Sequence, residues 1–248
     1  MNQLLIATNN PGKIKELHEL LDDTGIDLVT PAQINLDLDV IEDGLTYAEN
    51  ATKKAIAFAK RSGLISLADD SGLEVDALNG QPGLYSARYG STNGEKLSDK
   101  GRREFLIKNL QGKPRPWTAH FHATIAIATP AGHVTLSEAT LAPDAHLPRR
   151  AVAGSAGESL EDNQAETLRS LHYLRVTDID VYLAEGRCEG QIIPEDRGTG
   201  GFGYDPIFLL PELGRTMAEL PMEEKNRLSH RARAVMNAKQ ILDSVFSK

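Results

Sequence analysis

The chain opens with a short apolar run that leads directly into an amphipathic helix. The run, residues 4–7, suits a buried strand, and apolar residues then recur at helical spacing at Ile14, Leu17, Leu20 and Leu21. Between them, Asn10 can cap the helix. Pro11 suits its first position, because its ring fixes φ and lacks an N–H that would have no partner there. The order strand, tight turn, helix favours an α/β fold.

Further elements follow along the chain. Thr46 and Glu49 have capping-box spacing and predict a helix that ends near Gly63, before a buried strand over residues 64–68. Alternating apolar and polar residues over 117–128 predict a half-covered, antiparallel strand. We expect residues 134–139 to form its hairpin partner and residues 179–184 to form another strand.

Residues 140–178 differ in composition from the rest of the chain. They are rich in Pro, Ala, Gly, Ser and acidic residues, so we interpret them as a surface insertion. Elsewhere, strands separated by helices precede adjacent strands. This arrangement predicts a single α/β domain over residues 1–248, with a mixed sheet in two lobes.

Charge and composition exclude several classes of protein. With 27 basic and 35 acidic residues the net charge is −8, which argues against a broad surface for nucleic acid or anionic membrane. Cys188 is the single cysteine, so no disulfide framework or four-thiolate zinc site is possible within the chain. The sequence contains no signal peptide or long apolar span, and we expect a cytoplasmic protein.

The opening turn is a candidate anion site. It places backbone N–H groups and Lys13 at a helix N-terminus, where partial positive charge favours a phosphate. The Gly-x-x-x-x-Gly-Lys pattern of a P-loop is missing, so the alternative is a capped surface helix without a ligand.

Two adjacent carboxylates, Asp69 and Asp70, follow the predicted strand over 64–68. Their side chains point to opposite faces, so one can face a cleft while the other braces a loop. Together with Glu42, Asp70 could hold Mg²⁺ through oxygen ligands and water. The alternative is a solvated turn, since Asp-Ser-Gly is common in turns.

A glycine-rich segment over 198–206 contains a formal G-x-G-x-x-G. The residues after it look like a strand rather than a helix, which excludes the dinucleotide-binding fingerprint. Phe202 could instead stack on a base while Asp205 accepts hydrogen bonds from its edge. A glycine turn with a core Phe is the alternative.

Charged residues before the last helix form another candidate site. If Ser229 caps that helix, His230 and Arg231 occupy its first turn and Lys225 lies on the incoming loop, so the three could meet at one anion. A solvated charge run is the alternative.

His120 and His122 share a strand face without a third ligand nearby, and we interpret them as exposed residues rather than a zinc site.

Taken in order, these stretches resemble the inosine triphosphate pyrophosphatase family. The matching segments are ATNNPGKIKEL, EDGLTYAENATKKA, LADDSGLEVDALNGQPGLYSARYG, GTGGFGYDPIF and TMAELPMEEKNRLSHRARA, and only residues 140–178 lack a counterpart. The resemblance implies an elongated mixed α/β sheet in two lobes around a nucleotide cleft, and a homodimer. It also implies Mg²⁺-dependent hydrolysis of nonstandard purine nucleoside triphosphates such as ITP, dITP and XTP to the monophosphate and pyrophosphate.

The resemblance also implies roles for individual residues. Asp70 matches the proton acceptor, and Glu42 and Asp70 match the carboxylates that organise Mg²⁺. The remaining matches are substrate-binding positions: Thr8, Asn9, Asn10, Pro11, Gly12, Lys13, Lys54, Ser71, Arg88, Phe202, Gly203, Tyr204, Asp205, Lys225, His230 and Arg231. The expected chemistry is attack of water at the α-phosphorus without a covalent intermediate.

Three other functions compete with this one. A pyrophosphatase for other altered nucleotides would differ in a substrate panel, and a silent nucleotide-binding module that recruits a partner would show no turnover. A nicotinamide-dependent enzyme is disfavoured by the predicted strand after Gly203.

Overall fold

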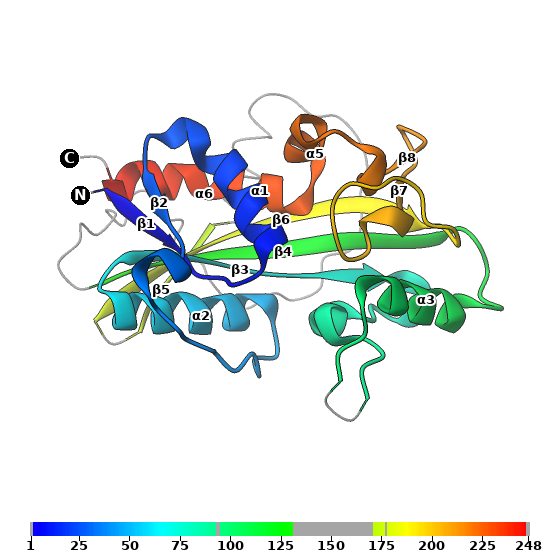
Figure 1. The fold of residues 1–248 in the computed structure, drawn as a ribbon, viewed down its shortest axis with the longest axis horizontal. Helices are drawn as coiled ribbons and strands as arrows, with labels where there is room; N and C mark the ends of the chain where they lie inside the picture. Colours follow the sequence, from blue (N-terminus) through cyan, green and yellow to red (C-terminus); the bar gives the residue numbers. More distant parts are fainter. Residues whose placement is uncertain (1, 93–94, 131–170, 177, 247–248) are drawn as a thin grey trace.

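The computed structural model describes residues 2–92, 95–130, 171–176 and 178–246. One mixed sheet runs through the length of the molecule (Figure 1). Its strands are β1 (Gln3–Ile6), β2 (Asp27–Val29), β3 (Ile65–Val75), β4 (Trp117–Thr129), β5 (Leu171–Val176), β6 (Ile179–Ile192), β7 (Phe208–Leu210) and β8 (Arg215–Thr216). The helices are α1 (Pro11–Leu21), α2 (Tyr47–Ser62), α3 (Asp99–Leu110), α5 (Met222–Leu228) and α6 (His230–Phe246).

The strand order is β2-β1-β3-β4-β6-β7-β8, with β5 paired to β6. The pairs β1–β2 and β1–β3 are parallel, and the other pairs are antiparallel. The predicted mixed α/β fold is therefore confirmed. Residues 134–139 and most of the predicted insertion lie outside the described residues, but 171–176, near its end, form β5.

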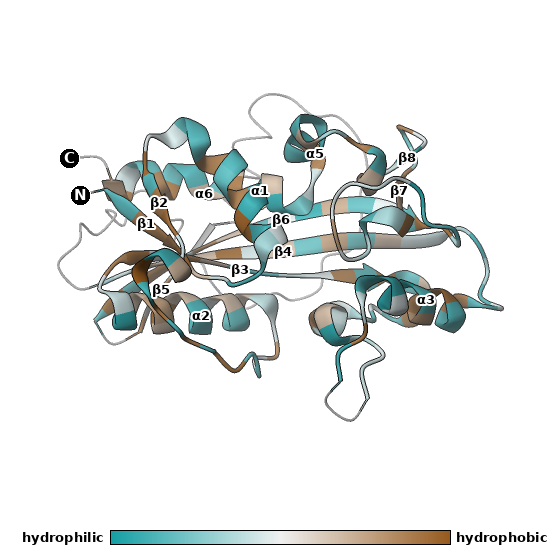
Figure 2. Ribbon diagram, viewed as in Figure 1, coloured by the Kyte–Doolittle hydropathy of each residue, from teal (hydrophilic) through white to brown (hydrophobic). Residues whose placement is uncertain are grey.

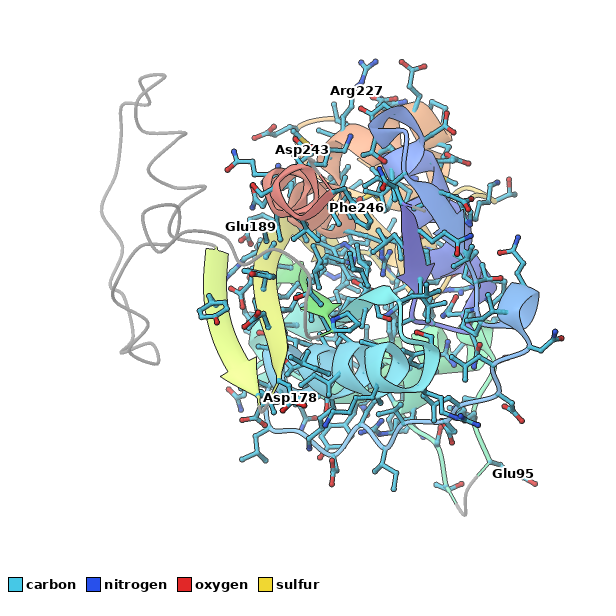
Figure 3. All side chains as sticks on the ribbon, turned by 90° about the vertical axis from the view of Figure 1, so that its left-hand side faces the viewer. Glu95, Asp178, Glu189, Arg227, Asp243 and Phe246 are labelled. Atoms are coloured by element: carbon cyan, nitrogen blue, oxygen red, sulfur yellow. The ribbon has the colours of Figure 1, made fainter. Side chains whose placement is uncertain are left out.

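Helices cover both faces of the sheet. Helix α2 packs on one face through Ala55 and Phe58, and α6 packs on the other through Val235 and Ala238. Figure 3 shows this layering end-on, with α6 and α2 on opposite sides of the strands. In Figure 2, α2 and α6 alternate between hydrophilic and hydrophobic residues, as helices with one buried face do.

The prediction that β4 is half covered is wrong. Its polar face carries His120, which is buried, and His122, which stacks on Tyr47 of α2 at a ring distance of 5.1 Å. Strand β4 lies between β3 and β6, so helices cover it from both sides. The antiparallel pairing and the alternating register agree with the sequence.

Strand β3 is longer than predicted. The sequence suggests an end at Ala68, but the ladder with β4 continues through Asp69, paired with Ile125, and Asp70, paired with Thr124. Both carboxylates therefore lie within a strand at the centre of the sheet. Strand β6 likewise continues past the predicted end at Ala184, as far as Ile192.

Candidate active site

A cavity of about 390 Å³ brings together most of the residues predicted to form a site. Its lining includes Thr8, Asn9, Asn10, Lys13, Glu42, Lys54, Asp70, Ser71, Arg88, Phe202, Gly203, Tyr204, Asp205, Lys225, His230 and Arg231. Pro11 and Gly12 do not line it. They belong to the same turn, and a side-chain carbon at Gly12 would lie 2.7 Å from the Phe202 ring, so the turn packs directly against the glycine-rich loop.

The opening turn has the predicted cap but not a free row of N–H groups. Oδ1 of Asn10 accepts hydrogen bonds from the N–H groups of Gly12 at 2.9 Å and Lys13 at 3.2 Å. Asn10 N–H donates to Thr8 Oγ1 at 3.2 Å. These three donors are paired within the turn in this conformation, and the anion site at this turn stays a prediction. Thr8, Asn9, Asn10 and Lys13 of this segment line the cavity.

Lys13 and Lys54 converge on one carbonyl oxygen. Their ammonium groups donate to Asp69 O at 3.2 Å and 2.8 Å, although α1 and α2 pack on opposite sides of the sheet. Burial lowers the pKa of Lys13, and the nearby Lys54 charge adds to that effect. Two ammonium groups this close repel each other, and a bound anion would offset that repulsion.

Two carboxylates lie on either side of Lys54. Its Nζ is 2.8 Å from Glu42 Oε1 and 3.5 Å from Asp70 Oδ1. Burial raises the pKa of Asp70, against the opposing effect of the Lys54 charge. Burial also disfavours the charged form of Glu42, but the Lys54 charge lowers its pKa overall.

These carboxylates fit a hard divalent cation. Oxygen atoms of both carboxylates lie near the Lys54 ammonium group, so they already surround a positive charge. Mg²⁺ is commonly held by one or two carboxylates plus phosphate oxygens and water. Among the residues that the structure describes, no three His, Cys, Asp or Glu side chains form a metal cluster. Glu42 and Asp70 would therefore supply only part of a ligand set for such a cation.

The other carboxylate of the pair, Asp69, faces away from Asp70, as the strand geometry predicts. Its Oδ2 lies 2.6 Å from Lys13 Nζ and 3.0 Å from Arg231 Nη2. Burial alone would raise the pKa of Asp69, but the Arg231 and Lys13 charges hold it well below its usual range.

This contact belongs to a buried ion-pair chain in which the charges alternate. Glu16 joins the two halves, because its carboxylate binds both Arg231 Nη1 and Lys225 Nζ, the latter at 2.6 Å. Lys225 also lies 2.6 Å from Asp205 Oδ2. We use the term buried ion-pair chain for Asp205, Lys225, Glu16, Arg231, Asp69 and Lys13. It links Asp205 of the glycine-rich loop to Lys13 of α1.

The residues before α6 are arranged partly as predicted. Ser229 Oγ accepts a hydrogen bond from Ala232 N at 3.1 Å and so caps α6. Lys225, expected on a loop, lies instead in the short helix α5. The His230 ring stacks on Phe121 at 4.7 Å, and burial lowers its pKa well below the usual value, so the imidazole is neutral.

The glycine-rich loop supplies an aromatic wall. Lys225 Nζ lies 5.3 Å and Arg231 Cζ 5.7 Å from the centre of the Phe202 ring. Phe202 N–H donates to Asp205 Oδ2 at 2.9 Å, and Tyr204 OH donates to Ser86 O at 2.9 Å. A single 3₁₀ turn, Asp205–Ile207, leads into strand β7 at Phe208, so no α-helix follows the loop directly and the dinucleotide fingerprint is excluded.

Other predicted residues have more peripheral positions. Ser71 Oγ accepts from Arg231 Nη2 at 3.0 Å, so it touches the buried ion-pair chain. Arg88 is exposed at the cavity edge, with its guanidinium 4.9 Å from the centre of the Tyr85 ring. His120 is buried, with its Nε2 3.1 Å from Glu74 Oε2, so the prediction of an exposed side chain is wrong.

Sequence reasoning missed Glu16, Lys96 and Arg102. Glu16 is 2 % exposed, and its only sequence signal is its position one turn after Lys13 on the same helix. Lys96 and Arg102 line the cavity from α3 and the segment before it, where no motif is visible in the sequence. Within the described residues, no helix is long and apolar enough to cross a membrane.

Comparison with known proteins identifies relatives over nearly the whole chain. The dITP/XTP pyrophosphatase of Desulforamulus reducens is 40% identical over 245 residues, covering 98% of this chain and 97% of that protein. The dITP/XTP pyrophosphatase of Bacillus subtilis is 35% identical over 245 residues, covering 98% of each.

Solved structures of related proteins are also similar to this chain. The Ham1 protein of Staphylococcus aureus matches with a TM-score of 0.69 at 32% identity, covering 98% of both chains. A HAM1 protein from Coxiella burnetii matches with the same score and identity, covering 98% of this chain and 100% of that one. The sequence itself matches the Ham1 family over residues 4–150 and 149–241. These matches confirm the family predicted from the motifs, and the chain belongs to the Ham1 family.

Proposed function

We propose that this protein hydrolyses nonstandard purine nucleoside triphosphates, such as ITP, dITP and XTP, to the monophosphate and pyrophosphate. The observation that carries the proposal is the convergence of Lys13 and Lys54 on Asp69 O, beside the Asp70 carboxylate and in one cavity with Phe202. A triphosphate satisfies the two ammonium groups, and a base can lie against the aromatic ring. The names of the D. reducens and B. subtilis relatives support the same activity.

In this proposal Asp70 orients the attacking water and accepts its proton. Burial raises the pKa of Asp70, which makes its carboxylate a stronger base than an exposed Asp. Lys13 and Lys54 stabilise the charge that develops on the leaving pyrophosphate. Glu42 and Asp70 would hold Mg²⁺, which supplies further neutralisation of phosphate charge when bound.

Substrate choice is proposed to depend on the purine 6-position. His230 lines the cavity, and its buried Nδ1 has no hydrogen-bond partner among the described residues. A neutral imidazole that donates from this atom favours a 6-keto oxygen and leaves its donor unpaired against the 6-amino group of ATP. This preference would remove inosine and xanthosine nucleotides from the nucleotide pool.

The proposal extends to the state of the protein in the cell. We propose a homodimer in the cytoplasm, without nucleic-acid or membrane partners. The net charge of −8 supports the absence of a polyanion surface. Light scattering of the purified protein tests the dimer: a monomer mass across the working concentration range would refute it.

A substrate panel tests the activity. The protein is incubated with ITP, XTP, GTP and ATP, each with Mg²⁺ or with chelator, and phosphorus products are identified. The proposal expects monophosphate and pyrophosphate from ITP and XTP, slow turnover of ATP, dependence on Mg²⁺, and loss of activity in Asp70→Asn. Inosine diphosphate and orthophosphate as products would refute it, and tight ITP binding without turnover would favour the silent binding module.

A further inference from the structure

Helix α3 holds the backbone of the glycine-rich loop at Gly203. Gly203 N–H donates to Asp99 Oδ2 at 2.6 Å, and Arg103 Nη1 donates to Gly203 O at 2.8 Å. These two bonds fix the peptide group on each side of Gly203. Both partners come from the first two turns of one helix, which lies at the opposite end of the sheet from β1 (Figure 1).

Arg103 also binds Asp196, two residues before the same loop. Its Nε and Nη2 donate to the two carboxylate oxygens of Asp196 at 2.9 Å and 2.5 Å. A bidentate pair of this kind fixes both distance and orientation. One guanidinium group, 12% exposed, thus joins Asp196 to Gly203 and closes the segment between them.

Gly203 depends on such bonds because it has no side chain of its own to pack. Its φ of +61° is a left-handed conformation, and a side-chain carbon there would meet no atom of the described residues within 4 Å. Glycine reaches many other conformations at little cost, so an unrestrained Gly203 would let the neighbouring residues rotate. The neighbour on one side is Phe202, whose ring packs on Gly12 and forms the wall of the cavity.

We propose that Asp99 and Arg103 are positioning residues for nucleotide selectivity. Neither lines the cavity, whereas Phe202, Gly203, Tyr204 and Asp205 all do. The two residues act through Gly203: they keep the Phe202 ring at one distance from the base, so that a 6-keto and a 6-amino purine meet the same fixed donors. The selectivity part of this inference rests on the proposed function, but the restraint on the loop does not.

Two substitutions weaken the restraint without touching the cavity. Arg103→Gln removes the donor to Gly203 O and the pair with Asp196, and Asp196→Asn weakens the pair alone. Asp99 is left unchanged, because its carboxylate also binds Arg102, which lines the cavity. Lys100→Gln is the matched control: it removes one positive charge from the same helix, and its pair with Glu104 is exposed and 3.8 Å long.

Three measurements are made on each variant: steady-state hydrolysis of ITP and ATP, hydrogen–deuterium exchange of residues 198–206, and thermal unfolding. For Arg103→Gln we expect KM for ITP to rise about tenfold, the value for a lost hydrogen bond to a charged group, with kcat little changed. The ratio of kcat/KM for ITP over ATP should fall, and exchange should speed up within 198–206 but not in α6. Asp196→Asn should lower the selectivity ratio and speed up exchange within 198–206, each by less than Arg103→Gln does. Lys100→Gln should change neither the ratio nor the exchange rate.

The inference is overturned if Arg103→Gln and Asp196→Asn change selectivity and exchange no more than Lys100→Gln does. Faster exchange with unchanged selectivity also overturns the positioning role. If Arg103→Gln does not fold, Asp196→Asn decides by the same two measurements. If the wild-type protein hydrolyses no nucleotide, the proposed function fails, and the exchange data alone then decide whether α3 restrains the loop.

Discussion

Replacing Asp69 by Asn removes one charge from the buried ion-pair chain without changing the size of the side chain. The Asp69 side chain is fully buried, and its Oδ2 binds Lys13 at 2.6 Å and Arg231 at 3.0 Å. In the variant, both cations remain buried and lose their shared partner. Breaking a buried ion pair in this way costs about 3–5 kcal/mol, which is a large part of the usual ~5–15 kcal/mol stability of a domain.

The cost has a defined dependence on pH. The Arg231 and Lys13 charges outweigh the effect of burial and hold the pKa of Asp69 below its value in the unfolded chain, about 3.9. A group with a lowered folded pKa contributes its full stability above the unfolded pKa and loses it as the pH falls toward the folded pKa. The difference between wild type and Asp69→Asn should therefore be the same at pH 7 and pH 5, and should shrink only below about pH 4.

Urea unfolding at pH 7 and pH 5 measures this difference, with Asp43→Asn as the control. Asp43 forms an ion pair of the same 2.6 Å length with Lys53, but its side chain is 68% exposed. We expect no measurable loss of stability in the control, because solvent screens an exposed pair. An Asp69→Asn variant as stable as Asp43→Asn would refute the reasoning, as would a difference that changes strongly between pH 7 and pH 5.

Three further predictions concern packing, capping and catalysis. Gly186→Ala in β6 should lower the free energy of unfolding by about 3 kcal/mol or more in urea unfolding, because the new carbon would lie 2.2 Å from His230 O and 2.3 Å from Ala234 N; a loss below 1 kcal/mol would contradict it. Ser229→Ala should cost about 1 kcal/mol in the same assay, since it removes the cap at Ala232 N, and an unchanged midpoint would contradict it. Finally, kcat/KM for ITP should fall as the pH drops through the raised pKa of Asp70; an acid limb at or below the ordinary Asp value of about 3.9 would argue against Asp70 as the base.

Local chemistry explains which features were predictable from the sequence. Asn10 caps α1 and Pro11 occupies its first position, because capping depends only on residues within one turn. Ser229 caps α6 for the same reason. The opposite orientations of Asp69 and Asp70 follow from the alternation of any strand.

Features that depend on distant partners were not predictable. The strand that carries Asp69 continues because β4 pairs with it, and the sequence pattern of β3 alone suggests an end at Ala68. Glu16 binds Arg231, 215 positions away along the chain, so no local pattern marks it as part of the site. His120 looks exposed in the sequence because the alternation cannot show that a second layer covers its face of the sheet.

The proposed attack of water at the α-phosphorus is tested most directly by hydrolysis of ITP in ¹⁸O-labelled water. Mass spectrometry then locates the label in the products. The account predicts that one ¹⁸O enters the inosine monophosphate and none enters the pyrophosphate, because the Asp70-bound water would attack the α-phosphorus and Lys13 and Lys54 would stabilise the pyrophosphate as it leaves. Label in the pyrophosphate would place the attack at the β-phosphorus and contradict the proposed arrangement of the site.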